Sequence, residues 1–446
     1  MERTELGYDA RLLRPIAETG RRFWIFAGVL LSIGAWGVFA WFSQLRQGLS
    51  VTGMNVPVYW GLYITNFVFF IGISHAGTLI SAILRLAQAE WRRSITRAAE
   101  VITVLVLFFG MGSILLDVGR PDRVFNVFTH GNLESPLLWD VISVSLYLTA
   151  STFYLYLPLI PDIAILRDHM PSRRWFYGPL ALGWTGAPHQ VRLLNKLIAI
   201  MAIVVIPIAV SVHTVVSWVF AMTVQPMWHS TIFGPYFVVG AIFSGIGALI
   251  IAMAIVRRAY HLEDYLKPIH FNNLGLLLLV MALLWFYFTF AEFLTTFYGA
   301  EPTHMTIFLS KVEGAFAPLF WTMVVTCFVI PFVLLANRRT RGTIWGVVAA
   351  SVSVEIGMWL ERFLIVVPSL SQPRLPLEAA TYVPSWVEWS LFAAFVAIFI
   401  LLYAVFTKLF PIVSIWEIRE GREHAEKEVA ARIASYLPPV EEALHD

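Results

Sequence analysis

The chain has 446 residues, of which 58% are hydrophobic, 15% aromatic and only 13% charged. A soluble domain is about 45–50% apolar and about 25% charged, so this composition excludes disorder, collagen and a coiled coil and argues against a water-soluble protein. The 31 basic and 29 acidic residues leave a net charge of +2, which is too small to indicate a nucleic-acid partner. The single cysteine, Cys327, excludes an internal disulfide, and cysteine-ligated iron–sulfur and zinc sites need more cysteines. We therefore predict an all-α, polytopic membrane protein.

Ten apolar stretches are long enough to cross a bilayer, which takes about 20 helical residues. They lie at residues 23–43, 58–86, 98–118, 136–160, 193–217, 231–257, 273–298, 313–336, 343–367 and 385–409. Basic residues gather in every second connection and beside both ends of the chain, for example at Arg92, Arg93 and Arg97. Because positive residues accumulate on the cytoplasmic side, both termini are expected to be cytoplasmic. Charged residues among the first 22 positions also predict that the chain has no cleavable signal peptide.

Two pairs of segments resemble each other across a distance of four spans. The segment GLYITNFVFFIGISHAGTLISAILR starts at Gly61, and GPYFVVGAIFSGIGALIIAMAIVRR starts at Gly234, with glycine, tyrosine and arginine positions aligned without a gap. SPLLWD, from Ser135, likewise matches APLFWT, from Ala317. Four is an even number, so the copies have the same orientation in the membrane. We therefore predict two tandem four-helix bundles in a parallel repeat, with one flanking helix at each end.

This repeat divides the chain into six predicted parts. They are a cytoplasmic N-terminal segment (1–22), a first helix with its outer loop (23–57), a first bundle (58–217), a second bundle (231–367), a tenth helix (385–409) and a cytoplasmic tail (410–446). The tail sequence EIREGREHAEKEVAARIASYL is charged and favours a helix, either one that binds a partner or one that is simply solvated.

The repeat differs at ionisable positions. His75 aligns with Ala248, and Asp140 aligns with Thr322. An ionisable group inside the hydrocarbon region is costly unless it is paired or faces a polar cavity. Since the second copy folds without these two groups, chemistry explains them better than folding does. A neutral histidine and a carboxylate are suited to accept a proton from a hydroxyl group.

A polar loop, Asp117-Val-Gly-Arg-Pro-Asp-Arg123, follows the third span. Arg120 and Arg123 could keep a nearby carboxylate ionised, and the alternative is a salt bridge that only fastens the loop. His213, in the fifth span, either lines the same cavity or lies in the headgroup layer.

The second bundle carries further charges within its predicted spans. Glu292 lies in the seventh span, and Glu355, Glu361 and Arg362 lie in the ninth. Glu292, Glu355 and Arg362 are candidates for a proton path. The alternative is a structural ion pair between Arg362 and a neighbouring carboxylate.

The helix containing ISHAGTLIS, the DVGRPDR loop and the SPLLWD segment together resemble the NrfD/PsrC family of membrane quinone-reactive subunits. The two flanking spans make the chain similar to the longer branch of that family, the ActC and ActF subunits of alternative complex III. The segment WHSTIFGPYFVVGAIFSG and the run FAEFLTTFYG are more similar to ActC. The resemblance covers about residues 20–410.

This resemblance implies a membrane subunit of a respiratory or photosynthetic complex that binds and oxidises menaquinol, with proton translocation left open. It implies no haem, iron–sulfur cluster or metal in the chain itself. The implied partners are an iron–sulfur subunit on the periplasmic face, c-type haem subunits and a homologous NrfD-like membrane subunit, in the bacterial inner membrane. The implied catalytic residues are His75, Asp140 and Asp117, and Arg120 and His213 join them in the quinone pocket.

Two other functions stay open. A secondary transporter also uses duplicated bundles, although transporter repeats are often inverted and contain broken helices. A structural or proton-conducting subunit that binds no quinol, similar to ActF, is the other alternative. Co-purification with iron–sulfur and haem subunits, or solute transport by the isolated chain in liposomes, would distinguish them.

Overall fold

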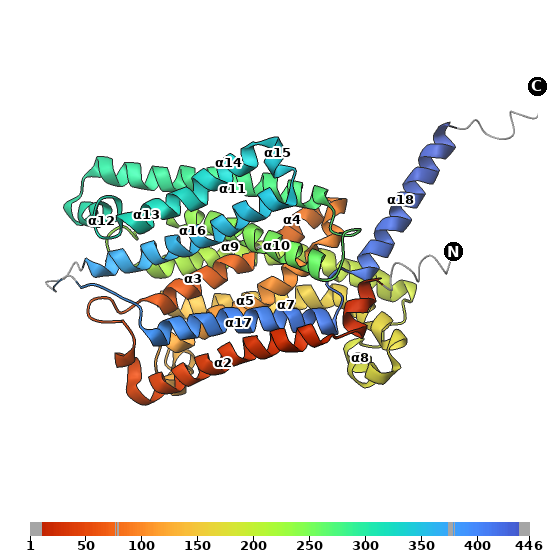
Figure 1. Cartoon of the computed structure of the whole chain (residues 1–446), viewed down its shortest axis with the longest axis horizontal. Helices are drawn as coiled ribbons and strands as arrows, with labels where there is room; N and C mark the ends of the chain where they lie inside the picture. Colours follow the sequence, from red (N-terminus) through yellow and green to blue (C-terminus); the bar gives the residue numbers. More distant parts are fainter. Residues whose placement is uncertain (1–10, 76, 78–79, 373–377, 379, 437–446) are drawn as a thin grey trace, which may run out of the picture.

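A computed structural model describes residues 11–75, 77, 80–372, 378 and 380–436; positions 1–10, 76, 78–79, 373–377, 379 and 437–446, including parts of the predicted N-terminal segment, second span and tail, lie outside the described residues. Every regular element in the described part is a helix, and the long helices run side by side (Figure 1). Eight of the described helices are long and apolar enough to span a membrane. The prediction of an all-helical, polytopic membrane protein is therefore confirmed.

The long helices correspond to the predicted spans. They are α2 (Arg21–Gln47), α5 (Thr96–Asp117), α7 (Pro136–His169), α9 (Pro188–Ala221), α10 (Phe233–Ala259), α11 (Pro268–Gly299), α17 (Trp386–Leu409), and the pair α13 (Ala317–Val324) and α14 (Ile330–Ala336), joined by the π-helical turn η6 (Val325–Val329). Short elements occupy the connections: η1 (Gly48–Val51), η3 (Glu90–Ser94), η4 (Pro121–Arg123), α6 (Asn126–Thr129), η5 (Pro171–Arg173), α8 (Arg174–Leu180), α12 (Pro302–Val312) and α15 (Arg338–Arg341).

Two predicted spans are less regular than the others. The second consists of α3 (Leu62–His75) and α4 (Ser81–Leu86), with a π-helical conformation at Gly77 and Ile80 between them. The ninth is α16 (Ile344–Ser371), an unbroken helix that is more polar because it contains three charged residues. Both are packed inside the molecule, where they contribute much of the polar interior.

The helices pack in two groups that match the predicted repeat. In the first group α3 lies against α5, α7 lies against α9, and α4 also contacts α9. In the second group α10 lies against α11 and α16, and α16 contacts α13 and α14. The groups meet where α10 and α16 contact α3. Helices α2 and α17, from opposite ends of the chain, pack together along one side (Figure 1), and the domain boundaries themselves stay a prediction.

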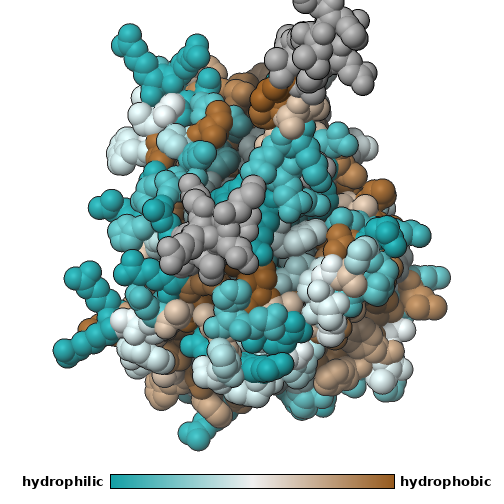
Figure 2. All heavy atoms as spheres, turned by 90° about the vertical axis from the view of Figure 1, so that its right-hand side faces the viewer, coloured by the Kyte–Doolittle hydropathy of each residue, from teal (hydrophilic) through white to brown (hydrophobic). Residues whose placement is uncertain are grey.

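The two ends of the helix bundle differ. The helix α18 (Ile415–Tyr436) projects from one end, which we call the α18 end, and this confirms that the charged tail is helical (Figure 1). Viewed from that side, much of this face is hydrophilic (Figure 2). The flanks of the long helices instead expose large apolar side chains, such as Trp24, Phe39 and Ile203. Such apolar flanks between polar ends are expected of a protein surrounded by lipid.

Small residues allow α2 and α17 to approach closely. A methyl group added at Gly34 would lie 2.5 Å from Cδ1 of Ile398, and one added at Gly37 would lie 2.2 Å from Cβ of Ala394. Van der Waals packing of small residues is a main source of helix association in lipid, where no hydrophobic driving force acts between helices.

Replacing Gly37 by alanine should lower the melting temperature of the protein in detergent, because the new methyl group forces α2 away from α17. Overpacking of this kind costs about 1–3 kcal/mol of unfolding free energy. Gly28→Ala on the same helix is the matched control, since no atom lies within 4 Å of its new methyl group. Equal melting temperatures for the two variants in a thermal unfolding assay would contradict the close contact.

Candidate functional site

Two buried histidines from different helices meet in the first bundle. His75 is the last residue of α3, and His213 lies in the last third of α9. Their ring centroids are 3.8 Å apart, and both side chains are fully buried. Nε2 of His75 lies 2.7 Å from the carbonyl oxygen of Ala209, one turn before His213. The structure therefore places His213 in the protein interior beside His75, and the headgroup position is wrong.

The remaining ring nitrogens of this pair are unusual for a buried site. Within the described part of the chain, Nδ1 of His75 and both ring nitrogens of His213 have no hydrogen-bond partner. Buried polar atoms are nearly always satisfied, and each exception calls for an explanation. A ligand hydroxyl or carbonyl group beside the pair would satisfy these nitrogens, so the residues fit a polar ligand head.

Hydrogen bonds fix the end of α3 just before His75. The hydroxyl groups of Tyr147, on α7, and Thr103, on α5, donate to the carbonyl oxygen of Ser74 at 3.0 Å and 2.6 Å. The Tyr147 ring also lies beside the imidazole of His75, with 5.5 Å between centroids. Three helices of the first bundle therefore hold the histidine pair in one orientation.

Asp140 and Asp117 lie farther from the α18 end than the histidine pair does. Asp140 is 4% exposed and precedes Tyr147 by seven residues on the same face of α7, a distance of about 10 Å along the helix axis. Asp117 ends α5 close to Tyr63, whose hydroxyl donates to Oε1 of Gln44 at 2.6 Å. One carboxylate oxygen of each aspartate is buried without a hydrogen-bond partner among the described residues. The structure thus lines up His75, Asp140 and Asp117 within the first bundle without bringing them into contact.

Arg120 lies outside this buried group. Its guanidinium group bonds the carboxylate of Asp122 at 3.0 and 3.1 Å, and the two side chains are 61% and 59% exposed. The hydrogen bond from Arg120 lowers the pKa of Asp122. Arg120 therefore forms the loop salt bridge that the alternative interpretation of this segment expects, and a quinone contact for it stays a prediction.

A second polar region lies in the second bundle. A cavity of about 40 Å³ is lined by the charged groups of Glu292, Lys311 and Glu361 among aromatic and aliphatic side chains. It has room for roughly two or three water molecules. The hydroxyl group of Ser230 donates to Glu292 at 2.6 Å, and the indole nitrogen of Trp285 donates to Glu361 at 3.0 Å. Two carboxylates and a lysine around one small cavity can exchange protons through water.

Glu292 connects this cavity to a wider pocket of about 240 Å³ farther from the α18 end. That pocket is also lined by Ser230, His229 and His304, and the two histidine ring centroids are 4.8 Å apart. Glu355 belongs to neither space, and its Oε1 instead lies against α10, 2.6 Å from the position of a methyl group at Gly247. The predicted proton-path residues are therefore not all in one place.

Lys311 is a residue of this region that the sequence interpretation missed. It lies on α12, in a connection between two predicted spans, and burial lowers its pKa to about 8. Ile307 and Lys311 are the buried residues of this helix and lie four positions apart. This spacing puts the lysine on the inward face, and the amphipathic pattern was the available signal.

Arg362 stands between the two polar regions. Its Nη1 lies 3.0 Å from Oε2 of Glu361, and its guanidinium carbon lies 4.8 Å from the ring centroid of Phe237 on α10. It is also near enough to His75 and His213 to act on both imidazoles electrostatically. The ion pair with Glu361 is the structural role that the sequence offered as an alternative, and its position also connects the two bundles.

Comparison with known proteins identifies the architecture that carries these groups. The family described as "Polysulphide reductase, NrfD" matches residues 50–374. The chain belongs to the NrfD family. The matched residues include the histidine pair of the first bundle and the cavity of the second, so both polar regions lie within the part shared with the NrfD family.

Three relatives illustrate the range of the family. The chain is 29% identical over 255 residues to a protein of Halobacterium salinarum described as a putative dimethyl sulfoxide reductase membrane subunit, and the match spans only about half of that relative, 56% of each chain. It is 23% identical over 400 residues to the Hdr-like menaquinol oxidoreductase integral membrane subunit of Archaeoglobus fulgidus, covering 86% of this chain and 92% of the relative. It is 22% identical over 423 residues to the menaquinone reductase integral membrane subunit of Nitratidesulfovibrio vulgaris, covering 88% and 92%. All three names describe membrane subunits of oxidoreductases.

Replacing Arg362 by methionine should strongly destabilise this NrfD-family protein, because Glu361 keeps a buried charge without its partner. Breaking a buried ion pair from one side costs about 3–5 kcal/mol. The double variant with Glu361→Gln should cost less than the sum of the single variants in a double-mutant cycle of unfolding. Arg432→Met, in an exposed pair on α18, is the control and should change stability by less than about 1 kcal/mol. Additive single effects would contradict the coupling.

Proposed function

We propose that this chain is the menaquinol-oxidising membrane subunit of a multi-subunit oxidoreductase, with its site at the His75–His213 pair. The observation that carries the proposal is this pair: two fully buried imidazoles, 3.8 Å apart, with unpartnered ring nitrogens. Menaquinol and menaquinone in the names of two relatives that match more than 90% of their own length support the choice of substrate.

The proposed chemistry uses neutral imidazoles as proton acceptors. A quinol hydroxyl group donates a hydrogen bond to a free ring nitrogen of the pair, and the imidazole accepts the proton as electrons leave. Each menaquinol gives up two electrons and two protons and becomes menaquinone. The electrons pass to an iron–sulfur cluster of a partner subunit, and Asp140 and Asp117 lead protons away from the α18 end.

The proposed orientation follows from the charge distribution. Arg85, Arg92, Arg93 and Arg97 gather at the α18 end, and the positive-inside rule assigns such an end to the cytoplasm. In a bacterial inner membrane, Asp117 and Arg120 then face the periplasm. The iron–sulfur subunit docks on that face, with c-type haem subunits and a second NrfD-like membrane subunit as further partners. The resemblance to ActC supports this assembly.

We further propose that the second bundle moves protons. The support is the row of groups from the wide pocket through Glu292 to the cavity with Lys311 and Glu361. Arg362 lies between Glu361 and the histidine pair, so a charge change at the quinol site acts on this row.

Replacing His75 by alanine or Asp140 by asparagine should reduce quinol:acceptor turnover by about 100-fold or more, because the site loses a proton acceptor. Turnover of the purified complex is the measurement, and subunit composition checks that the complex still assembles. His189→Ala, at the exposed start of α9, is the control and should keep normal turnover. Normal turnover in both site variants would overturn the assignment.

Replacing Glu292 by glutamine or Lys311 by methionine should lower the number of protons moved per quinol in proteoliposomes. In the unmodified protein this number should fall as the pH at the mouth of the wide pocket rises through about 8, because Lys311 is cationic below its pKa of about 8 and neutral above it. Lys427→Met on the exposed part of α18 is the control. A proton yield that ignores both the variants and the pH would contradict a proton path here.

A further inference from the structure

Glu100 is a buried carboxyl group that neither the sequence interpretation nor the proposed site uses. It lies on α5 and is 3% exposed. The hydroxyl group of Ser81 donates to Oε1 of Glu100 at 2.6 Å and also lies 3.1 Å from the hydroxyl group of Tyr154. Within the described residues, no basic side chain lies within 4 Å of the Glu100 carboxyl group to form an ion pair with it, although Arg85 is near enough to act on it electrostatically.

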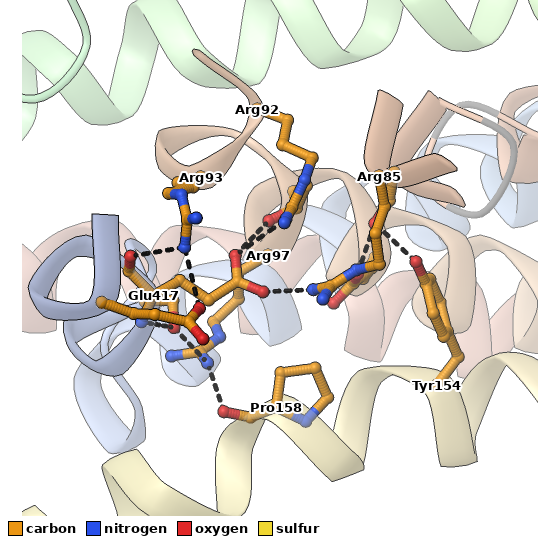
Figure 3. Close-up of polar contacts among 12 residues, drawn as sticks. Arg85, Arg92, Arg93, Arg97, Tyr154, Pro158 and Glu417 are labelled. Atoms are coloured by element: carbon orange, nitrogen blue, oxygen red, sulfur yellow. Dashed lines mark hydrogen bonds and ion pairs between the residues drawn. The ribbon is translucent and has the colours of Figure 1, made fainter. Parts of the chain in front are cut away.

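The α18 end of the first bundle is closed directly beside this group. Glu417, in the first turn of α18, is 2% exposed at its side chain and pairs with both Arg85 and Arg92 (Figure 3). The burial of Glu417 alone would raise its pKa, but the surrounding guanidinium groups hold the pKa below its ordinary value. Glu417 is therefore an anion in neutral solution, and it neutralises the arginines at this end.

A second ion pair anchors the same segment more deeply. Arg97 pairs with Asp162, whose carboxylate also accepts hydrogen bonds from the backbone nitrogens of Ile415 at 3.1 Å and Trp416 at 2.8 Å. Arg97 donates as well to the carbonyl oxygen of Pro158 at 2.9 Å (Figure 3). The charged groups at this end thus satisfy one another, whereas Glu100 lies one step farther inside with only hydroxyl partners.

From Glu100, polar groups continue on inward helix faces toward His75. Thr103 follows Glu100 by three residues on α5, and Tyr147 precedes Tyr154 by seven on α7, so each pair shares one helix face. Thr103 and Tyr147 are the two residues that bond the carbonyl oxygen next to His75. The step between the two levels is about two helix turns, or 10 Å, which a few hydrogen-bonded water molecules can bridge.

We propose that Glu100 is a proton-relay residue that connects the His75–His213 pair with the α18 end of the first bundle. A structural acceptor for Ser81 does not require a carboxyl group, since a glutamine amide oxygen would accept the same hydrogen bond without a titratable group in the membrane interior. A carboxyl group without a close counter-charge can instead take up and release a proton. The histidine pair then has a proton route to each face, through Glu100 to one and through Asp140 to the other.

This inference rests on the proposed quinol site, and the experiment separates the two. Glu100→Gln should lower quinol:acceptor turnover by about 100-fold and raise the solvent hydrogen/deuterium isotope effect on the remaining turnover, because proton transfer becomes rate-limiting. Glu100→Asp keeps a carboxyl group and should restore part of the rate. Glu428→Gln, an equal charge change at an exposed position of α18, should leave both quantities unchanged.

Tyr154→Phe provides a second test of the same route if the Glu100→Gln protein does not assemble, because it removes one hydroxyl group and keeps the ring. It should lower turnover and raise the isotope effect in the same way. Normal turnover with a normal isotope effect in Glu100→Gln and Tyr154→Phe, while His75→Ala is inactive, would overturn the relay and leave the quinol site intact. Normal turnover in all three variants would overturn the quinol site as well.

Discussion

An ionised side chain inside a membrane protein is stable only beside a counter-charge, hydrogen-bond donors or water, and this requirement arranges the interior of the chain. At the α18 end the arginines meet it by pairing with Glu417 and Asp162. In the second bundle Arg362 meets it by pairing with Glu361. Helix packing, the position of α18 and the contact between the bundles all follow from these pairs, because separating any of them leaves a charge in an apolar surrounding.

The groups that do not meet this requirement through an ion pair gather in the first bundle. His75 and His213 can stay neutral, and Asp140 and Glu100 are nearly fully buried. Buried acids and bases of this kind cost folding free energy and are typical of sites where protons move. A transporter would need such groups around a solute cavity, whereas here they follow inward helix faces on both sides of the histidine pair. Proton transfer explains this linear arrangement better than solute binding does.

Hydropathy, span length and the internal repeat predicted the fold well, because the cost of exposing backbone groups to lipid leaves few alternatives to long apolar helices. The same repeat drew attention to His75 by aligning it with Ala248. The sequence could not place His213, since that depends on how α9 is rotated against α3. It also missed Glu100 and Lys311. Glu100 follows the basic Arg97 and resembles a residue of the polar rim, and Lys311 lies two residues outside a predicted span.

The position of Arg362 suggests how the two bundles work together without a large movement. Two unit charges about 8 Å apart in a medium of effective dielectric constant near 20 interact by about 2 kcal/mol. An imidazolium formed at the histidine pair would therefore repel the Arg362 guanidinium group and shift its balance with Glu361. Glu361 lines the cavity that holds Lys311 and Glu292, so the same charge changes the proton affinity of that cavity. A free energy of this size alters a protonation equilibrium about 30-fold, which is enough to couple proton release in the second bundle to each proton accepted in the first.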